Sequence, residues 1–233
     1  MIDLPFLTES LRALLAGLPL TLSLAGGSVA LGLVLAGLAA AGRLSGIAAL
    51  DGVARLYVFV FRGTPLLVQL FLIYYGLGQF RPDLQAVGLW WFFREPYWCA
   101  LLALTLNTGA YTAEIIRGGV LAVPHGAVLA GRACGMSRGL LLRRIVLPLA
   151  ARQALPAYGN EVISVVKATS LASTITLLDL TGIAQKLIAQ SFRALEVFVC
   201  AGAFYLAITL AIIGLVRLAE TLLAPDLRRP RPA

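Results

Sequence analysis

Long apolar runs make up most of this chain, and charged residues gather in the short stretches between them. An α-helix rises about 1.5 Å per residue, so about 20 apolar residues cross the hydrocarbon core of a membrane. Runs of about that length occupy residues 13–42, 63–80, 96–113, 148–172 and 197–216. The pattern predicts five transmembrane helices, the second with a helical lead-in from about residue 47.

The fourth run is the least uniform, because it carries Arg152, Glu161 and Lys167. Composition supports its assignment to the membrane. Hydrophobic residues make up 60% of the 233 residues and charged residues 13%, whereas soluble domains average about 45–50% and about 25%. A soluble enzyme, a disordered protein and a disulfide-rich secreted module are therefore excluded, and we predict an all-α integral membrane protein.

The basic residues between the runs predict the orientation, because Lys and Arg favour the cytoplasmic side. Twelve arginines fall on one side: Arg43, Arg55, Arg117, Arg132, Arg138, Arg143, Arg144, Arg152, Arg217, Arg228, Arg229 and Arg231. Five basic residues fall on the other: Arg12, Arg81, Arg94, Lys186 and Arg193. We expect the N-terminus outside and the C-terminus inside, which requires an odd number of spans.

The formal net charge of +8 does not indicate nucleic-acid binding, because the basic residues follow the membrane topology and form no patch. Cys99, Cys134 and Cys200 are too far apart for a disulfide framework or a metal site. No G-x-x-x-x-G-K-[ST] loop is present, so the chain has no phosphate-binding loop of that kind. With His125 as its single histidine, it offers no catalytic constellation, and we predict no enzyme activity and no bound cofactor.

The largest cytoplasmic segment runs over residues 117–148 and is too rich in Gly and Arg to span the membrane. A turn at 123–126 and a break at Gly135 predict two short helical pieces. The small residues Ala130, Gly131 and Ala133 allow another backbone to approach closely, which favours a docking element. The alternative is a solvated basic loop that only obeys the positive-inside rule.

Polar side chains inside the spans are the candidate cargo site, since charges in a membrane usually face a cavity or a partner. Glu161, Asn160 and Asn107 are expected to line a cavity for an ammonium or a cationic side chain. The alternative for Glu161 is an ion pair with Lys167 or Arg152.

Thr64 and Gln69 belong to the same candidate site, because Gly63 and Pro65 are expected to kink the second span and free backbone carbonyls there. A plain helix start at the membrane edge would explain the same residues. Elsewhere, Glu114 is expected to form an ion pair with Arg117 or Arg62, rather than to contact cargo. Asp179 is expected in an outer loop or a re-entrant segment near the turn at Gly182, with its side chain solvated.

Four motifs in order resemble a known family. They are FRGTPLLVQLF at 61–71, LNTGAYTAEIIRGG at 106–119, GRACGMSRGLLLRRIVLP at 131–148 and LPAYGNEVISVVKATSLAS at 155–173. The third is similar to the cytoplasmic EAA loop of bacterial ABC-importer permeases, and together they resemble the polar amino-acid branch, which imports His, Lys, Arg, ornithine, Gln or opines. The resemblance covers about residues 12–222.

The resemblance implies a type I importer permease: one transmembrane domain over residues 1–233, in the bacterial inner membrane, that carries amino acids. It implies three protein partners: an ATPase that binds the ATP, a periplasmic binding protein, and a second permease, identical or homologous. Coupling to the ATPase would involve Ala130, Gly131, Arg132, Ala133, Gly135 and Ser137. The chain departs from the family where Leu129 replaces the acid of the EAA loop and Ala168 replaces the acid after Lys167.

Two other classes remain as alternatives. A secondary transporter usually has internal repeats and more spans, and five spans leave no room for two such halves. An oligomeric channel needs a selectivity filter, and no segment of the sequence has the pattern of one.

Overall fold

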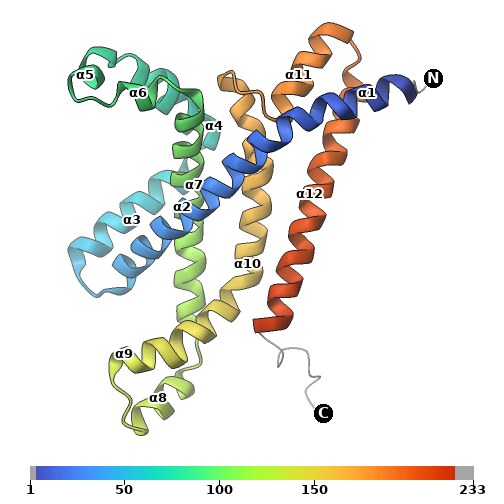
Figure 1. Cartoon of the computed structure of the whole chain (residues 1–233). Coiled ribbons are helices and arrows are strands. Elements are labelled where there is room, and N and C mark those ends of the chain that lie inside the picture. Colours follow the sequence, from blue (N-terminus) through green and yellow to red (C-terminus); the bar gives the residue numbers. More distant parts are fainter. Residues whose placement is uncertain (1–3, 224–233) are drawn as a thin grey trace.

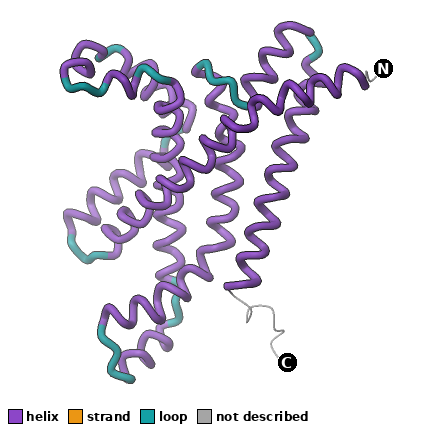
Figure 2. Tube along the Cα trace, viewed as in Figure 1, coloured by secondary structure: helices purple, strands orange, loops and turns teal. Residues whose placement is uncertain are grey.

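The computed structural model describes residues 4–223, and this part of the chain consists of helices joined by short loops, with no strand (Figure 2). The elements in chain order are α1 (Leu4–Leu14), η1 (Leu15–Gly17), α2 (Leu18–Leu44), α3 (Ala48–Gly63), α4 (Leu66–Phe71), η2 (Leu72–Gly76), α5 (Arg81–Ala86), α6 (Trp90–Phe93), α7 (Pro96–Leu121), α8 (His125–Ala133), α9 (Arg138–Leu141), η3 (Leu142–Val146), α10 (Leu147–Ala168), η4 (Thr169–Ile175), α11 (Leu180–Ser191) and α12 (Ala194–Leu223).

Three helical stretches within residues 4–223 are long and apolar enough to cross a membrane: Pro5–Leu44, Pro96–Leu121 and Ala194–Leu222. Two bent pairs bring the number to five if each counts as one span. The pair α3 and α4–η2 bends by 104°, and the pair Arg138–Ile175 and α11 bends by 49°. All five coincide with the predicted spans, and the all-α membrane fold is confirmed.

The helices have two distinct ends in Figure 1. The short helices α8 and α9 lie at one end, together with the last turn of α12, whereas α1, α5, α6 and α11 lie at the other. This places the 117–148 segment opposite the start of the chain, as an odd number of crossings requires. Which end is cytoplasmic stays a prediction from the basic residues, three of which (Arg228, Arg229 and Arg231) lie outside the described residues.

Helix α7 is the centre of the bundle and packs most extensively on α2 and then on α10. Small residues allow α7 to pack closely on α2 and α3. A β-carbon on Gly32 of α2 would lie 2.5 Å from the Thr108 methyl group, and one on Gly109 of α7 would lie 2.7 Å from the Tyr57 hydroxyl of α3. Close backbone approach over small residues is the usual way that helices associate in lipid.

Charged side chains join the ends of α2, α3 and α7 nearest the 117–148 segment. Glu114 pairs with Arg117 at 2.8 Å, as predicted, and also with Arg43 at 2.6 Å. Arg43 pairs with Asp51 at 3.0 Å, and Asp51 pairs with Arg55 at 2.6 Å. The sequence did not indicate the Arg43 contacts, because they join residues far apart in the chain.

Asp179 corrects an expectation, because its side chain is 0% exposed rather than solvated. It is the N-cap of α11, where its carboxylate accepts hydrogen bonds from the backbone N–H groups of Gly182 at 2.9 Å and Thr181 at 3.3 Å. The Tyr205 hydroxyl of α12 donates to it at 3.3 Å. Burial of this acid therefore joins α11 to α12.

Reporter fusions test the orientation. Alkaline phosphatase, which folds only outside the cytoplasm, should be inactive when fused after Ser137, between α8 and α9. It should be active when fused after Gly88, between α5 and α6. Enzyme activity normalised to fusion-protein level is the measurement, and the reverse pattern would overturn the orientation.

Candidate substrate cavity and the 117–148 segment

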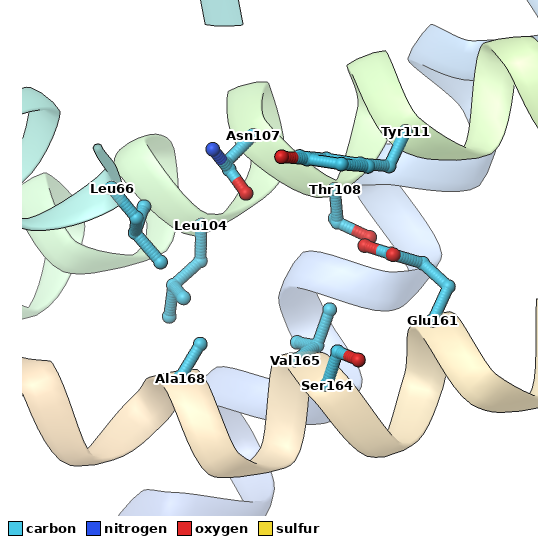
Figure 3. A pocket seen from close by; sticks show the side chains of 9 residues that line it. All are labelled: Leu66, Leu104, Asn107, Thr108, Tyr111, Glu161, Ser164, Val165 and Ala168. Carbon is cyan, nitrogen blue, oxygen red and sulfur yellow. The ribbon is translucent and has the colours of Figure 1, made fainter. Parts of the chain in front are cut away.

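A cavity of about 300 Å³ opens between α7 and α10, with one wall from the start of α4. Its lining is apolar at one end and polar at the other (Figure 3). The lining residues are Leu66, Leu104, Asn107, Thr108, Tyr111, Glu161, Ser164, Val165 and Ala168. Their spacing is that of one face on each of two helices, since residues three and four apart lie on the same side of a helix.

The polar end contains the carboxylate of Glu161. In Figure 3 this carboxylate lies beside the Thr108 hydroxyl, and the Tyr111 ring and the Asn107 side chain flank the same space. No ion pair joins Glu161 to any residue within 4–223, so the predicted alternative, a pair with Lys167 or Arg152, is not formed. An unpaired carboxylate in a membrane cavity favours a cationic ligand.

The wall near Leu66 depends on a break between α3 and α4. Thr64 is extended, with φ −118° and ψ 147°, as expected before a proline, and Pro65 has no N–H to donate. The last carbonyls of α3 therefore need other donors. The Thr64 hydroxyl donates to the Val60 carbonyl at 2.8 Å, which satisfies one of them.

Two side-chain amides donate hydrogen bonds to the carbonyls of Phe61 and Thr64 at this break. The buried Gln69 amide donates to the carbonyl of Phe61 at 2.9 Å and to that of Thr64 at 3.1 Å. Asn107 of α7 also donates to the Phe61 carbonyl, at 3.1 Å, and to the Gln69 side-chain oxygen, at 3.1 Å. The predicted kink is present, and side chains of the protein itself donate to the carbonyls of Val60, Phe61 and Thr64.

The five predicted cargo residues are thus separated into three groups. Asn107 and Glu161 line the cavity. Thr64 and Gln69 lie behind it, in the hydrogen bonds of the helix break. Asn160 faces another groove of about 200 Å³, between α10 and α12, because neighbouring residues on a helix point about 100° apart. Their contact with cargo stays a prediction.

Sequence reasoning missed three polar lining residues, Thr108, Tyr111 and Ser164. Helical spacing was the signal that could have found them. Tyr111 follows Asn107 at four positions, and Ser164 follows Glu161 at three, which places both on the cavity face. Thr108 follows Leu104, another lining residue, at four positions.

The 117–148 segment forms the two short helices that the sequence predicts. Helix α8 ends at Ala133, Gly135 has a φ of +73°, and α9 starts after the N-cap Ser137. Most of the predicted coupling residues are exposed, namely Ala130, Arg132, Ala133, Gly135 and Ser137. The segment therefore offers a surface of small and polar side chains at the end of the molecule.

The two glycines of this surface are needed for different reasons. A β-carbon on the buried Gly131 would lie 2.6 Å from a methyl group of Leu141 and 2.7 Å from one of Ile145. Gly131 therefore lets α8 pack on α9 and η3. A β-carbon on Gly135 would meet nothing within 4 Å, so its requirement is the left-handed backbone, which disfavours other residues.

These features define a helical, multi-pass membrane protein with a polar cavity between its spans. The chain matches the family "Binding-protein-dependent transport system inner membrane component" over residues 28–229, and it belongs to that family. It is thus a permease subunit of the ABC transporter class and not itself an enzyme.

Individual relatives agree with this assignment. The chain is 56% identical to the octopine transport system permease protein OccM of Rhizobium radiobacter, over 98% of this chain and 93% of that one. It is 43% identical to the histidine/lysine/arginine/ornithine transport system permease protein HisM of Escherichia coli (strain K12), over 88% and 86%. A crystal structure of an amino acid ABC transporter with histidines matches with a TM-score of 0.82 and 34% identity, covering 94% of this chain and 98% of that chain.

Replacing Gln69 with Leu tests the role of its amide at the helix break. The Thr64 carbonyl would lose its side-chain donor, and a buried unsatisfied group costs about 1–3 kcal/mol. We expect a lower thermal midpoint for the detergent-purified permease complex. Val68→Ala is the control, since Val68 immediately precedes Gln69 in α4 and its side chain is exposed. Equal thermal midpoints for wild type and Gln69→Leu would contradict the role of the amide.

Proposed function

We propose that this chain is the transmembrane subunit of an ATP-driven importer in the bacterial inner membrane, and that its cargo is a polar or cationic amino acid or an opine. The observation that carries the proposal is the cavity between α7 and α10, which has one unpaired carboxylate, Glu161. A cavity of about 300 Å³ is at the small end of the range for ligand sites.

The relatives support the cargo class. One is named for octopine and another for histidine, lysine, arginine and ornithine. Most of these compounds carry a cationic group at neutral pH besides the α-amino nitrogen, so they match a site with a free carboxylate. Glu161 would hold the cationic group, and Asn107 and Tyr111 would contact the remainder of the molecule.

Three protein partners complete the proposed importer. A separate ATPase would bind the ATP and rest against the 117–148 segment, so this chain would need no cofactor of its own. A binding protein outside the membrane would deliver the cargo. A second permease subunit, identical or homologous, would supply the other half of the pathway, because up to five spans form only half of one.

The 117–148 segment supports this arrangement because most of its predicted coupling residues are exposed. Its exposed small residues leave room for a partner backbone, as the sequence suggested. The family's acidic residue is absent here, and Leu129, which is 50% exposed, stands in its place. An apolar contact with the ATPase would replace the charged one.

A secondary transporter and an oligomeric channel are not favoured, because the family is one of ABC permease subunits. The cheapest independent check is the neighbouring genes, which should encode an ATPase with a Walker loop and a secreted binding protein.

Gly135→Leu tests the coupling role. A branched side chain would strain the left-handed backbone and add bulk on the surface proposed for the ATPase. We expect normal membrane insertion and continued ATP hydrolysis in proteoliposomes, but less cargo imported per ATP. Gly135→Asn is the matched control, because Asn tolerates this backbone conformation, and normal transport by Gly135→Leu would remove the docking role.

Glu161→Gln tests the cargo role. The change keeps size and hydrogen bonding but removes the charge, so uptake of a cationic substrate should fall at least tenfold, as expected from about 1.4 kcal/mol for one charge-assisted hydrogen bond. Labelled arginine uptake and membrane level are measured together.

Lys167→Gln is the control for Glu161→Gln, because it removes an exposed charge from the same helix outside the cavity. Its uptake should equal that of the wild type. A lower membrane level for Glu161→Gln, with normal uptake per molecule, would assign Glu161 a structural role, and no change in either quantity would remove it from the site.

A further inference from the structure

An arginine, Arg62, stacks on a side chain that lines the proposed cargo cavity. Arg62, in the last turn of α3, has its guanidinium carbon 5.0 Å from the centre of the Tyr111 ring. Tyr111 also lines the cavity, so one side chain contacts both the cation and the space for cargo. Within residues 4–223 no hydrogen bond or ion pair holds the Arg62 guanidinium. The guanidinium groups of Arg43 on α2 and Arg55 on α3, in contrast, both pair with Asp51.

The position of Arg62 is costly. Tyr111 follows Pro96 by 15 residues and precedes Leu121 by 10, so it lies about 22 Å from one end of α7 and about 15 Å from the other. The guanidinium on its ring is thus well inside the membrane-spanning layer. Cations at that depth usually face a pathway or an anionic partner, and a ring face offsets only part of the cost.

The anions near Arg62 differ in how they are compensated. Arg62 interacts electrostatically with both Glu114 and Glu161. Glu114 already has two partners, Arg43 and Arg117. Within residues 4–223, Glu161 forms no ion pair, either with Arg62 or with another residue. One free acid and one free base therefore share the neighbourhood of a cavity, without neutralising each other by contact.

We propose that Arg62 binds a carboxylate of the cargo while Glu161 binds its cationic group. The cavity would then select molecules that carry both charges. This inference rests on the proposed import of amino acids or opines and adds the residue that recognises their anionic end. A guanidinium fits a carboxylate through two parallel hydrogen bonds, and the Tyr111 ring holds the plane of the guanidinium beside the cavity in the absence of cargo.

The arrangement gives both protein charges a partner when cargo is bound. A carboxylate and a cationic group on one cargo molecule compensate Arg62 and Glu161 at once, so each protein charge gains a partner. Cargo without the carboxylate would leave Arg62 unpaired and would also add a positive charge near it. Discrimination between two such molecules is therefore expected to come from Arg62 and to disappear when its charge is removed.

Binding to the purified permease–ATPase complex without nucleotide tests the inference, since no binding protein then selects the ligand. The probes are labelled arginine and agmatine, which is arginine without its carboxylate. Wild type should bind arginine at least tenfold more tightly than agmatine. R62Q should weaken arginine binding at least tenfold and leave agmatine binding within about threefold, whereas E161Q should weaken both.

Two further variants keep the result interpretable. R55Q removes a guanidinium from the same helix, where Asp51 retains Arg43, and should behave as wild type. R62K keeps the charge but loses the planar fork, so arginine should bind several-fold more weakly, also if R62Q cannot be purified.

The possible failures are distinguishable. Full-strength arginine binding by R62Q or R62K, with weaker binding by E161Q, would overturn the role of Arg62 and leave the proposed function intact. Equal losses for arginine and agmatine in R62Q would assign Arg62 a structural role and overturn the inference as well. No binding of either probe by wild type would contradict the proposed cargo class, and the inference with it.

Discussion

The backbone break between α3 and α4 is the constraint on which the cavity depends. Inside a membrane no water satisfies a freed carbonyl, so a chain can leave the helical path only where side chains supply donors. Here the Phe61 carbonyl receives hydrogen bonds from both Gln69 and Asn107. Because Asn107 belongs to α7, the same bonds that satisfy the break fix α3 and α4 against the helix that lines the cavity. Polar residues that resemble cargo ligands in the sequence are thus first of all required by the backbone.

The distribution of charge follows from the same absence of water. Ion pairs link four charged residues at one end of α2, α3 and α7, namely Arg43, Asp51, Glu114 and Arg117. This network holds the three helix ends together and leaves no net demand for a ligand there. The charges near the cavity are arranged differently, because no described residue forms an ion pair with Glu161. The charges at the helix ends are paired with one another, as expected of a structural site. The carboxylate of Glu161 lacks such a pair, as expected of the proposed cargo site.

Much of the fold was predictable because lipid imposes simple rules on the sequence. Apolar length predicted the spans, and Gly and Pro predicted the break at Thr64 and the one at Gly135. The errors concern which neighbour each residue meets. Asp179 looked like a loop acid, although an acid just before a helix is a common N-cap, and its burial depends on Tyr205, which is 26 residues away in the chain. Such distant contacts depend on how the spans pack, and no local pattern specifies them. Asn160 differs, since its helical angle from Glu161 already placed it on another face.

Helices α7 and α10 both connect the 117–148 segment covalently to the cavity, and α10 is the one that carries Glu161. Helix α10 continues from η3, and it approaches its neighbours closely at two points. A β-carbon on Gly119 of α7 would lie 2.7 Å from the Ala150 carbonyl, and one on Gly159 would lie 2.7 Å from Val216 of α12. Between these two contacts lies Pro156, which cannot donate a helical hydrogen bond and weakens the helix locally. A displacement of α9 therefore either moves α10 as a rigid body against both neighbours or is absorbed at Pro156. Only rigid-body movement of α10 would carry the displacement to Glu161. Close packing at Gly119 and Gly159 would favour this movement over bending at Pro156.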